Sequence, residues 1–200
     1  MRSEGPGRVK GAPLRALLEY WEESHGTGSI RALSGRLPEA FVKELVLDTG
    51  RPGFGVLAGG WYSCEAAGAL LEELLAPEVP QRRDEVLQGI AEEVMGRTLK
   101  GVHRAIFRVV GSPELMRLWC QFFWNQQFDT GDVSIDGVEP GYQIHHYRNW
   151  SGHHPLLCQF AFGCVPPMFR AMGIEDCRME AVSCISAGAD ECVARIRWDA

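Results

Sequence analysis

Three cysteines and one glutamate in the last third of the chain are spaced like the ligands of a metal ion. Cys158 comes first, Glu180 follows, and Cys184 and Cys192 flank a short connection that contains Gly188. Thiolates and a carboxylate that a strand pair brings together can close a tetrahedral zinc site. Four protein ligands leave no open coordination position, so the pattern predicts a structural zinc ion held by Cys158, Glu180, Cys184 and Cys192.

The cysteines also allow two other interpretations. The chain has 7 cysteines, an odd number, and a free buried cysteine packs as a small hydrophobic residue. Such packing is the default expectation for Cys64, Cys120, Cys164 and Cys177. Cys184 and Cys192, if they face each other across a hairpin, would be close enough to share a metal ion or, in an oxidising setting, to form a disulfide.

A dense group of aromatic side chains precedes this region. The group consists of Trp119, Phe122, Phe123, Trp124 and Phe128. Because these residues recur at helical spacing, the default interpretation is that they pack in the core. The alternative is that they form one wall of a pocket for an apolar or aromatic ligand. In that case His103 or His146 would be the polar group that orients the ligand.

The rest of the sequence argues against several classes of function. It contains no Gly-x-Ser-x-Gly, no His-Glu-x-x-His and no dinucleotide-binding glycine motif, so no class of enzyme is indicated. The formal net charge is −6 with only 20 lysines and arginines, which disfavours binding to nucleic acids or membrane surfaces. No apolar run is long enough for a transmembrane helix or typical of a signal peptide, so we expect a cytosolic protein.

Helical periodicity dominates the chain up to Phe128, and strand-like segments follow. Apolar residues recur at helical spacing within the segments 13–25, 38–45, 63–76, 84–96, 99–110 and 112–128. The patterns of the segments 133–135, 142–147, 179–186 and 192–198 are typical of strands or short extended stretches. A helix is expected over residues 155–172, although Pro166 and Pro167 must break or kink it.

This order of elements predicts an α+β fold, because helices and strands are segregated and do not alternate. We expect residues 1–12 to form a flexible N-terminus and residues 13–200 to form a single domain. The N-terminal helical half, 13–128, would pack as a layer on a C-terminal antiparallel sheet formed by the half 129–200.

The segment from Leu156 to Trp198 resembles the C-terminal half of the 4-vinyl-reductase-type (4-vinyl reductase) small-molecule-binding domain, found in bacterial regulators that sense aromatic compounds. The positions that carry the resemblance are Cys158, Gly163, Gly173, Glu180, Cys184, Gly188 and Cys192. The whole chain also resembles an uncharacterised myxobacterial family of similar length, through its Ser-Pro-Glu-Leu-Met segment, Phe-Asp-Thr-Gly turn and Arg-x-Arg-Trp ending. Both groups are similar to the superfamily of haem-nitric-oxide-binding and Golgi-transport adaptor domains.

The resemblance implies a buried pocket between the helical layer and the sheet. The residues expected to line it are His103, Trp119, Phe123, Trp124, His146, Phe162, Met168 and Phe169. The expected function is that of a sensor for a small apolar or aromatic molecule, which signals through an interface, as a homodimer with exposed helical faces near Trp61 to Leu75. A protein–protein adaptor of the same fold is the alternative, and a reductase-like enzyme is the third.

Two departures from these families concern the metal and the cofactor. Glu180 precedes Cys184 by 4 residues, one more than in the sensor domains, and in a strand this offset turns a side chain to the other face unless a bulge restores it. His154 or Cys177 could then replace it as a ligand. The sequence also lacks the Tyr-x-Ser-x-Arg motif with which haem-nitric-oxide-binding domains hold the haem propionates, so we do not expect haem.

Overall fold

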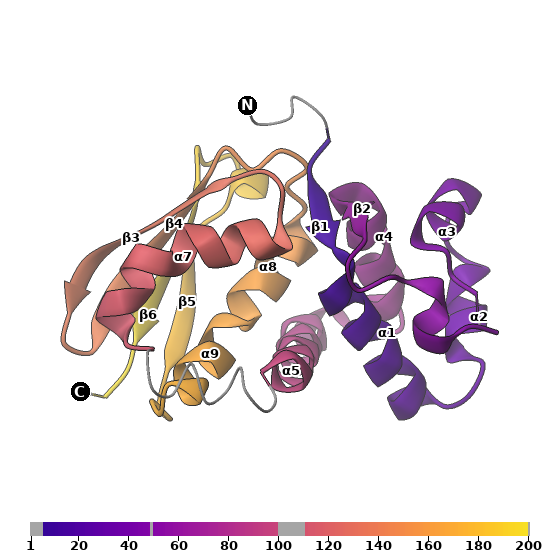
Figure 1. Ribbon diagram of the computed structural model, residues 1–200, viewed down its shortest axis with the longest axis horizontal. Helices are drawn as coiled ribbons and strands as arrows, with labels where there is room; N and C mark the ends of the chain where they lie inside the picture. Colours follow the sequence, from indigo (N-terminus) through magenta and orange to yellow (C-terminus); the bar gives the residue numbers. More distant parts are fainter. Residues whose placement is uncertain (1–5, 49, 100–110, 200) are drawn as a thin grey trace.

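The computed structural model describes residues 6–48, 50–99 and 111–199. A group of helices lies at one side of the molecule and an antiparallel sheet at the other, with α5 and α8 between them (Figure 1). The predicted α+β fold, with an N-terminal helical layer and a C-terminal antiparallel sheet, is confirmed. The helix expected over 99–110 falls almost entirely on residues outside the described ranges, and so does His103.

The helical half begins with a short strand. Its elements in chain order are β1 (Arg8–Lys10), α1 (Gly11–His25), α2 (Ser29–Ser34), α3 (Glu39–Leu45), the 3-10 turn η1 (Pro52–Gly55), β2 (Trp61–Ser63), α4 (Cys64–Leu75), α5 (Pro80–Thr98) and α7 (Pro113–Gln127). Within the segment 1–12, which the sequence predicts to be flexible, residues 8–10 form β1. Val9 is buried and β1 pairs with β2, while the Arg8 guanidinium binds Asp129 at 2.7 Å.

Local sequence signals explain where two of the main helices begin. The hydroxyl of Ser63 accepts a hydrogen bond from the Ala66 N–H at 3.1 Å and thereby caps α4. Ser112 caps α7 in the same way through Leu115, with Pro113 in the first turn. By contrast, Pro80 begins α5, although the sequence placed the start of this helix at residue 84.

The sheet half consists of four antiparallel strands in the order β3-β4-β6-β5. Its elements are β3 (Asp132–Glu139), β4 (Tyr142–Arg148), α8 (Pro155–Gly163), α9 (Val165–Ala171), β5 (Arg178–Ser183), the turn η2 (Ile185–Ala187) and β6 (Cys192–Arg197). The expected helix over 155–172 breaks at Cys164, because Pro166 and Pro167 occupy the first turn of α9, where no N–H is needed.

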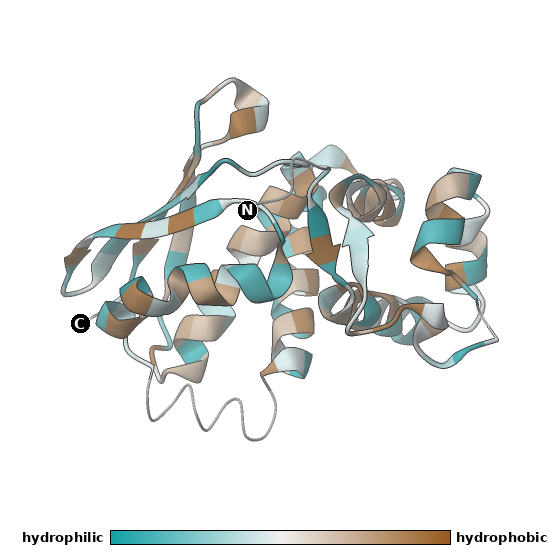
Figure 2. Cartoon of the chain, turned by 45° about the horizontal axis from the view of Figure 1, so that its top comes forward, coloured by the Kyte–Doolittle hydropathy of each residue, from teal (hydrophilic) through white to brown (hydrophobic). Residues whose placement is uncertain are grey.

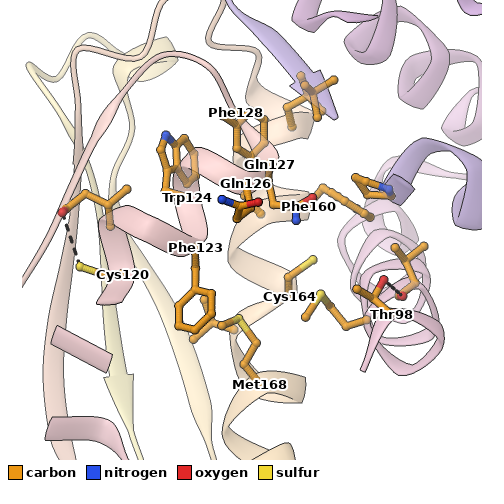
Figure 3. A pocket seen from close by; sticks show the side chains of 18 of the residues that line it. Thr98, Cys120, Phe123, Trp124, Gln126, Gln127, Phe128, Phe160, Cys164 and Met168 are labelled. Carbon is orange, nitrogen blue, oxygen red and sulfur yellow. Dashed lines mark hydrogen bonds between the residues drawn. The ribbon is translucent and has the colours of Figure 1, made fainter. Parts of the chain in front are cut away.

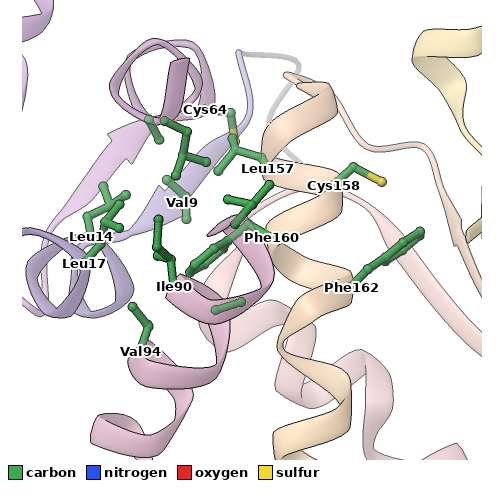
Figure 4. Packing of buried hydrophobic residues seen from close by; sticks show 14 of the residues in the cluster. Val9, Leu14, Leu17, Cys64, Ile90, Val94, Leu157, Cys158, Phe160 and Phe162 are labelled. Carbon is green, nitrogen blue, oxygen red and sulfur yellow. The ribbon is translucent and has the colours of Figure 1, made fainter. Parts of the chain in front are cut away.

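Most elements bury one face against the core, whereas the edge strand β5 has no buried residue. Hydrophobic and hydrophilic residues alternate along the strands and around the helices in Figure 2, as expected of elements with one solvent-exposed face. Helix α8 is buried on two sides: Leu157 and Phe160 point toward Val9 and Ile90 of the helical half, whereas Cys158 and Phe162 point the other way (Figure 4). Among the described helices, none is both long and apolar enough to cross a membrane.

Candidate metal centre and ligand cavity

Four side chains meet at one end of the sheet in a group that could hold a metal ion. The group consists of His153, Cys158, Cys184 and Cys192, whose ligand atoms all lie within 4.8 Å of one another. His153 comes from the loop after β4, Cys158 from α8, Cys184 from the end of β5 and Cys192 from the start of β6. We call this group the Cys3His cluster.

The distances within the cluster match a tetrahedral zinc site. The His153 Nε2 atom lies 3.5 Å from the Cys184 Sγ and 3.3 Å from the Cys192 Sγ, and the two sulfurs are 3.6 Å apart. Zinc–sulfur bonds of ~2.3 Å and zinc–nitrogen bonds of ~2.0 Å place tetrahedral ligands about 3.5–3.8 Å from one another. His153, Cys184 and Cys192 therefore already have the spacing of tetrahedral ligands, and the Cys158 sulfur lies within 4.8 Å of all three.

The loop before α8 positions His153 through backbone conformation and ring packing. Gly152 has a φ of 75°, and a Cβ atom there would lie 3.0 Å from the Gly7 backbone nitrogen and 3.1 Å from the Cys64 Cβ. This turn therefore requires glycine. The Trp150 ring packs edge-on against the His153 ring, with centroids 5.2 Å apart, and fixes the plane in which the imidazole lies.

The cluster favours a thiolate at Cys192. The Cys158 thiol donates a hydrogen bond to the Cys192 sulfur, and further bonds from His153 and the Ile185 N–H help to lower the pKa of Cys192 to about 4. The same bond, together with burial, raises the pKa of Cys158. Three cysteine sulfurs and one histidine nitrogen are a donor set that zinc binds in structural sites.

The structure changes the predicted zinc set at one position. Glu180 lies outside the cluster: its carboxylate is exposed and pairs with the Arg195 guanidinium at 3.1 Å, directly across from it on β6. The register shift between Ala181 and Ser183 comes after Glu180 and does not turn it inward. The proposed substitutes are also elsewhere, because His154 caps α8 and pairs with Glu72, and Cys177 lines a separate cleft.

A cavity of about 450 Å³ lies between the helical half and the sheet. Its walls come from β1, α1, α4, α5, α7, β3, β4, α8 and α9, and include the side chains labelled in Figure 3. Those are Thr98, Cys120, Phe123, Trp124, Gln126, Gln127, Phe128, Phe160, Cys164 and Met168. Most of the lining is apolar, and burial raises the pKa of the Cys164 thiol to about 12, so this thiol stays neutral.

The polar part of the deep wall comes from the central strand β4. His145 and Tyr147 both line the cavity, and with Gln143 they form the inward face of β4. Burial lowers the pKa of His145 to about 3, so its imidazole is neutral. Burial also raises the pKa of Tyr147 and keeps its hydroxyl protonated.

The residues predicted to bind a ligand are distributed over several environments. Phe123, Trp124 and Met168 line the cavity. Phe162 packs on the Tyr147 ring, with centroids 5.1 Å apart, and Phe169 packs on Trp198 at 5.2 Å. Trp119 is 54% exposed on α7, and His146 faces away from the cavity, with its Nδ1 atom 3.1 Å from the Glu191 carboxylate.

Sequence reasoning missed several residues of both sites. The sequence prediction includes neither His153 among the metal ligands nor His145 among the residues that line the pocket. The available signal was strand alternation, which puts only one of two neighbouring histidines on the inward face. The buried Gln143 two positions earlier on the same face marks that face as the inward one.

No family model matches this chain, and no curated protein matches it either. Solved structures of similar fold are H-NOX proteins. An H-NOX protein from S. oneidensis in an Fe(II)NO state is 13% identical with a TM-score of 0.66, over 96% of this chain and 99% of that one. An H-NOX mutant from K. algicida is 12% identical with a TM-score of 0.64, over 96% and 97% of the two chains. A structure from work on haem distortion in the H-NOX family is 8% identical with a TM-score of 0.56, over 96% and 95%.

These similarities correct two expectations from the sequence. The assignment to the 4-vinyl-reductase-type domain is wrong, because the matching structures are H-NOX proteins. The expectation that leaves haem out is also contradicted, because the H-NOX structures of similar fold include one from work on haem distortion.

Proposed function

We propose that this protein is a sensor domain that binds a small, largely apolar molecule in the cavity between the helical half and the sheet. The observation that carries the proposal is the cavity itself. Its volume of about 450 Å³ lies within the range of ~300–1,000 Å³ that is usual for small-molecule sites. Its wall combines many apolar side chains with a few buried polar groups on β4, which is the usual composition of such sites.

Haem is the first ligand to test, because H-NOX proteins share this fold. The described wall suits the apolar face of a macrocycle, with Phe123, Trp124 and Met168 among its members. Within that wall the only imidazole, His145, has both nitrogens near hydrogen-bonding partners, and no lysine or arginine is present. His103, the other histidine that the sequence predicts to bind the ligand, lies outside the described residues, and replacing it tests its part in haem binding.

The Cys3His cluster has a structural role in this proposal. With four protein ligands, a zinc ion would tie the ends of β5 and β6 to α8 and to the loop before it. Zinc that binds only the folded chain stabilises it by mass action. A cytosolic location and a homodimer belong to the same proposal.

The test uses haem and an apolar probe on the same protein. Purified protein is titrated with haem by absorption spectroscopy and with 2-isopropenylnaphthalene by calorimetry. Ala161→Phe puts a ring into the cavity, and we expect it to weaken binding of either ligand by at least about tenfold. Ala76→Phe on the exposed end of α4 is the matched control and should bind like the wild type.

The outcomes separate the ligand classes. Haem binding that His103→Ala abolishes, while the naphthalene still binds, would identify haem as the ligand and His103 as a residue that haem binding requires. Binding of the naphthalene alone would identify a sensor for an apolar organic molecule. If neither ligand binds, the sensor proposal is wrong.

A protein–protein adaptor is the second candidate function, favoured by the outer face of α7. Leu118 is 65% exposed and Trp119 and Phe122 are each 54% exposed, and these neighbours form an apolar stripe on one helix. Contiguous apolar surface of this kind marks an interaction site. If the stripe joins two copies of this chain, Trp119→Ser should convert a dimer to a monomer in light scattering after size-exclusion chromatography.

A further inference from the structure

Three neutral polar side chains form a row on the inward face of β4. Gln143 is fully buried, His145 is 3% exposed and Tyr147 is 5% exposed. The Gln143 Nε2 atom lies 2.6 Å from the His145 Nε2 atom, and the His145 Nδ1 atom lies 3.4 Å from the Tyr147 hydroxyl oxygen. Burying three polar side chains lowers the stability of the fold unless their hydrogen bonds are formed.

The number of protons that each side chain of the row carries determines which group donates in each hydrogen bond. Gln143 donates to the Nε2 atom of the neutral His145, so His145 carries its proton on Nδ1 and donates to the Tyr147 oxygen. The Tyr147 O–H then keeps its own proton to donate. In the reverse direction, with the Gln143 amide turned over, the NH2 group would take the position of the Oε1 atom, which has no hydrogen-bond partner among the described residues, and both amide protons would be unsatisfied.

The remaining wall contains few other groups that could bind a polar atom. The Thr98 hydroxyl already donates to the Val94 carbonyl at 2.9 Å. Gln126 is exposed and Gln127 is half-buried, which places both toward the mouth of the cavity. The Tyr147 hydroxyl is therefore the free donor at the buried end of the described wall.

We propose that the ligand of this cavity carries a hydrogen-bond-accepting oxygen at its buried end, which the Tyr147 hydroxyl binds. Tyr147 is the ligand-binding residue, and His145 and Gln143 are positioning residues that hold its hydroxyl in the donating direction. Successive hydrogen bonds in one direction polarise one another, which makes the terminal hydroxyl a stronger donor. This inference rests on the proposed function, because it assumes that the cavity takes a ligand.

The test compares two probes of nearly the same shape. 2-Acetylnaphthalene carries a carbonyl oxygen where 2-isopropenylnaphthalene carries a methylene group. A buried neutral hydrogen bond contributes enough to make the wild type bind the ketone about 3- to 10-fold more tightly than the alkene. Tyr147→Phe should remove this preference and leave the affinity for the alkene unchanged, which also shows that the variant is folded.

Infrared spectroscopy of the bound ketone, labelled with ¹³C at the carbonyl, tests the positioning residues. A hydrogen bond lowers the carbonyl stretching frequency in the wild type. The shift should vanish in Tyr147→Phe and become smaller in Gln143→Leu. His146→Gln, on the opposite face of the same strand, is the matched control and should keep the full shift.

Two negative results have different meanings. If both probes bind the wild type equally and the carbonyl frequency matches that in an apolar solvent, the cavity binds ligands but this inference is overturned. If neither probe binds, the proposed function fails and the inference fails with it.

Discussion

At the scale of single residues, His153 supplies the nitrogen that completes a set of four ligand positions around three thiols. Its Nε2 atom lies 3.3 Å from Cys192 and 3.5 Å from Cys184, while Glu180 pairs with Arg195 on the exposed side of the sheet. Replacing His153 and replacing Glu180 should therefore have different effects on zinc binding.

We expect His153→Ala to weaken zinc binding by more than about 10-fold, because one of four ligands is lost. Cys184→Ser should have the same effect, whereas Glu180→Gln should keep the zinc. Elemental analysis of the purified variants and competition with a chelator measure the change. Retention of zinc by His153→Ala together with its loss from Glu180→Gln would contradict the Cys3His cluster.

The neutral His145 makes stability depend on pH. In the unfolded chain a histidine has a pKa of ~6.5, whereas burial lowers the pKa of His145 to about 3 in the folded chain. Between these values the unfolded chain takes up a proton that the folded chain does not. The stabilisation is therefore complete above pH ~6.5 and falls by about 1.4 kcal/mol per pH unit as the pH drops toward 3.

Replacement of this histidine should remove that dependence. We expect the free energy of unfolding of His145→Gln to fall less steeply than that of the wild type between pH 6 and pH 4. Urea unfolding at several pH values in this range measures both slopes. Equal slopes would mean that His145 is protonated in the folded chain.

At the scale of the elements, α8 packs tightly against two neighbours. A Cβ atom at Gly163 would lie 2.9 Å from the Ala91 Cβ on α5, and one at Gly68 of α4 would lie 2.5 Å from the His154 ring at the start of α8. These glycines let the three helices approach closely. Gly89, also on α5, has no atom within 4 Å of a Cβ atom built there.

Substitutions at Gly163 and Gly89 should change the free energy of unfolding in opposite directions. Gly163→Val should lower the free energy of unfolding by about 1–3 kcal/mol, because the added methyl groups overpack the contact with Ala91. Gly89→Ala should raise it by up to about 1 kcal/mol, because glycine is a poor helix former and the site is open. Chemical denaturation of the two variants measures both effects, and a stabilised Gly163→Val would contradict the packing.

The elements were more predictable from the sequence than the sites. The apolar spacing of Leu14, Leu17 and Leu18 and the cap at Ser63 are local signals, and the structure has α1 and α4 where they predict. The Cys3His cluster joins residues from a loop, a helix and two strands, so its membership depends on tertiary packing. Strand alternation turns His145 and His146 to opposite faces, and which of the two faces inward depends on which face of β4 the helices cover.

At the scale of the whole molecule, the two halves share one core. The strand β1 pairs with β2 and also forms a bridge from Val9 to Phe128 at the end of α7. Leu157 and Phe160 of α8 are buried against the helical half, although α8 belongs by sequence to the sheet half. The division at residue 128 is therefore a boundary in sequence and not between independent folding units.

We expect the segment 129–200 expressed alone to remain unfolded, because it would expose the apolar side of α8. Circular dichroism and the dispersion of amide signals in NMR spectra measure this. The complete chain should unfold in a single cooperative transition in the same buffer. A folded fragment would show that the sheet half has a sufficient core of its own.

Neighbouring residues of α8 face the two sites: Leu157 lines the cavity and Cys158 belongs to the Cys3His cluster. A rotation of α8 would therefore change the geometry of both the cavity and the Cys3His cluster. Thermodynamic reciprocity then applies: the factor by which a bound ligand changes the affinity for zinc equals the factor by which zinc changes the affinity for the ligand. If α8 stays rigid, this factor is one, and neither site affects the other. If α8 rotates when a ligand binds, the affinity for zinc changes, and the zinc content of the protein then reports whether the ligand is bound.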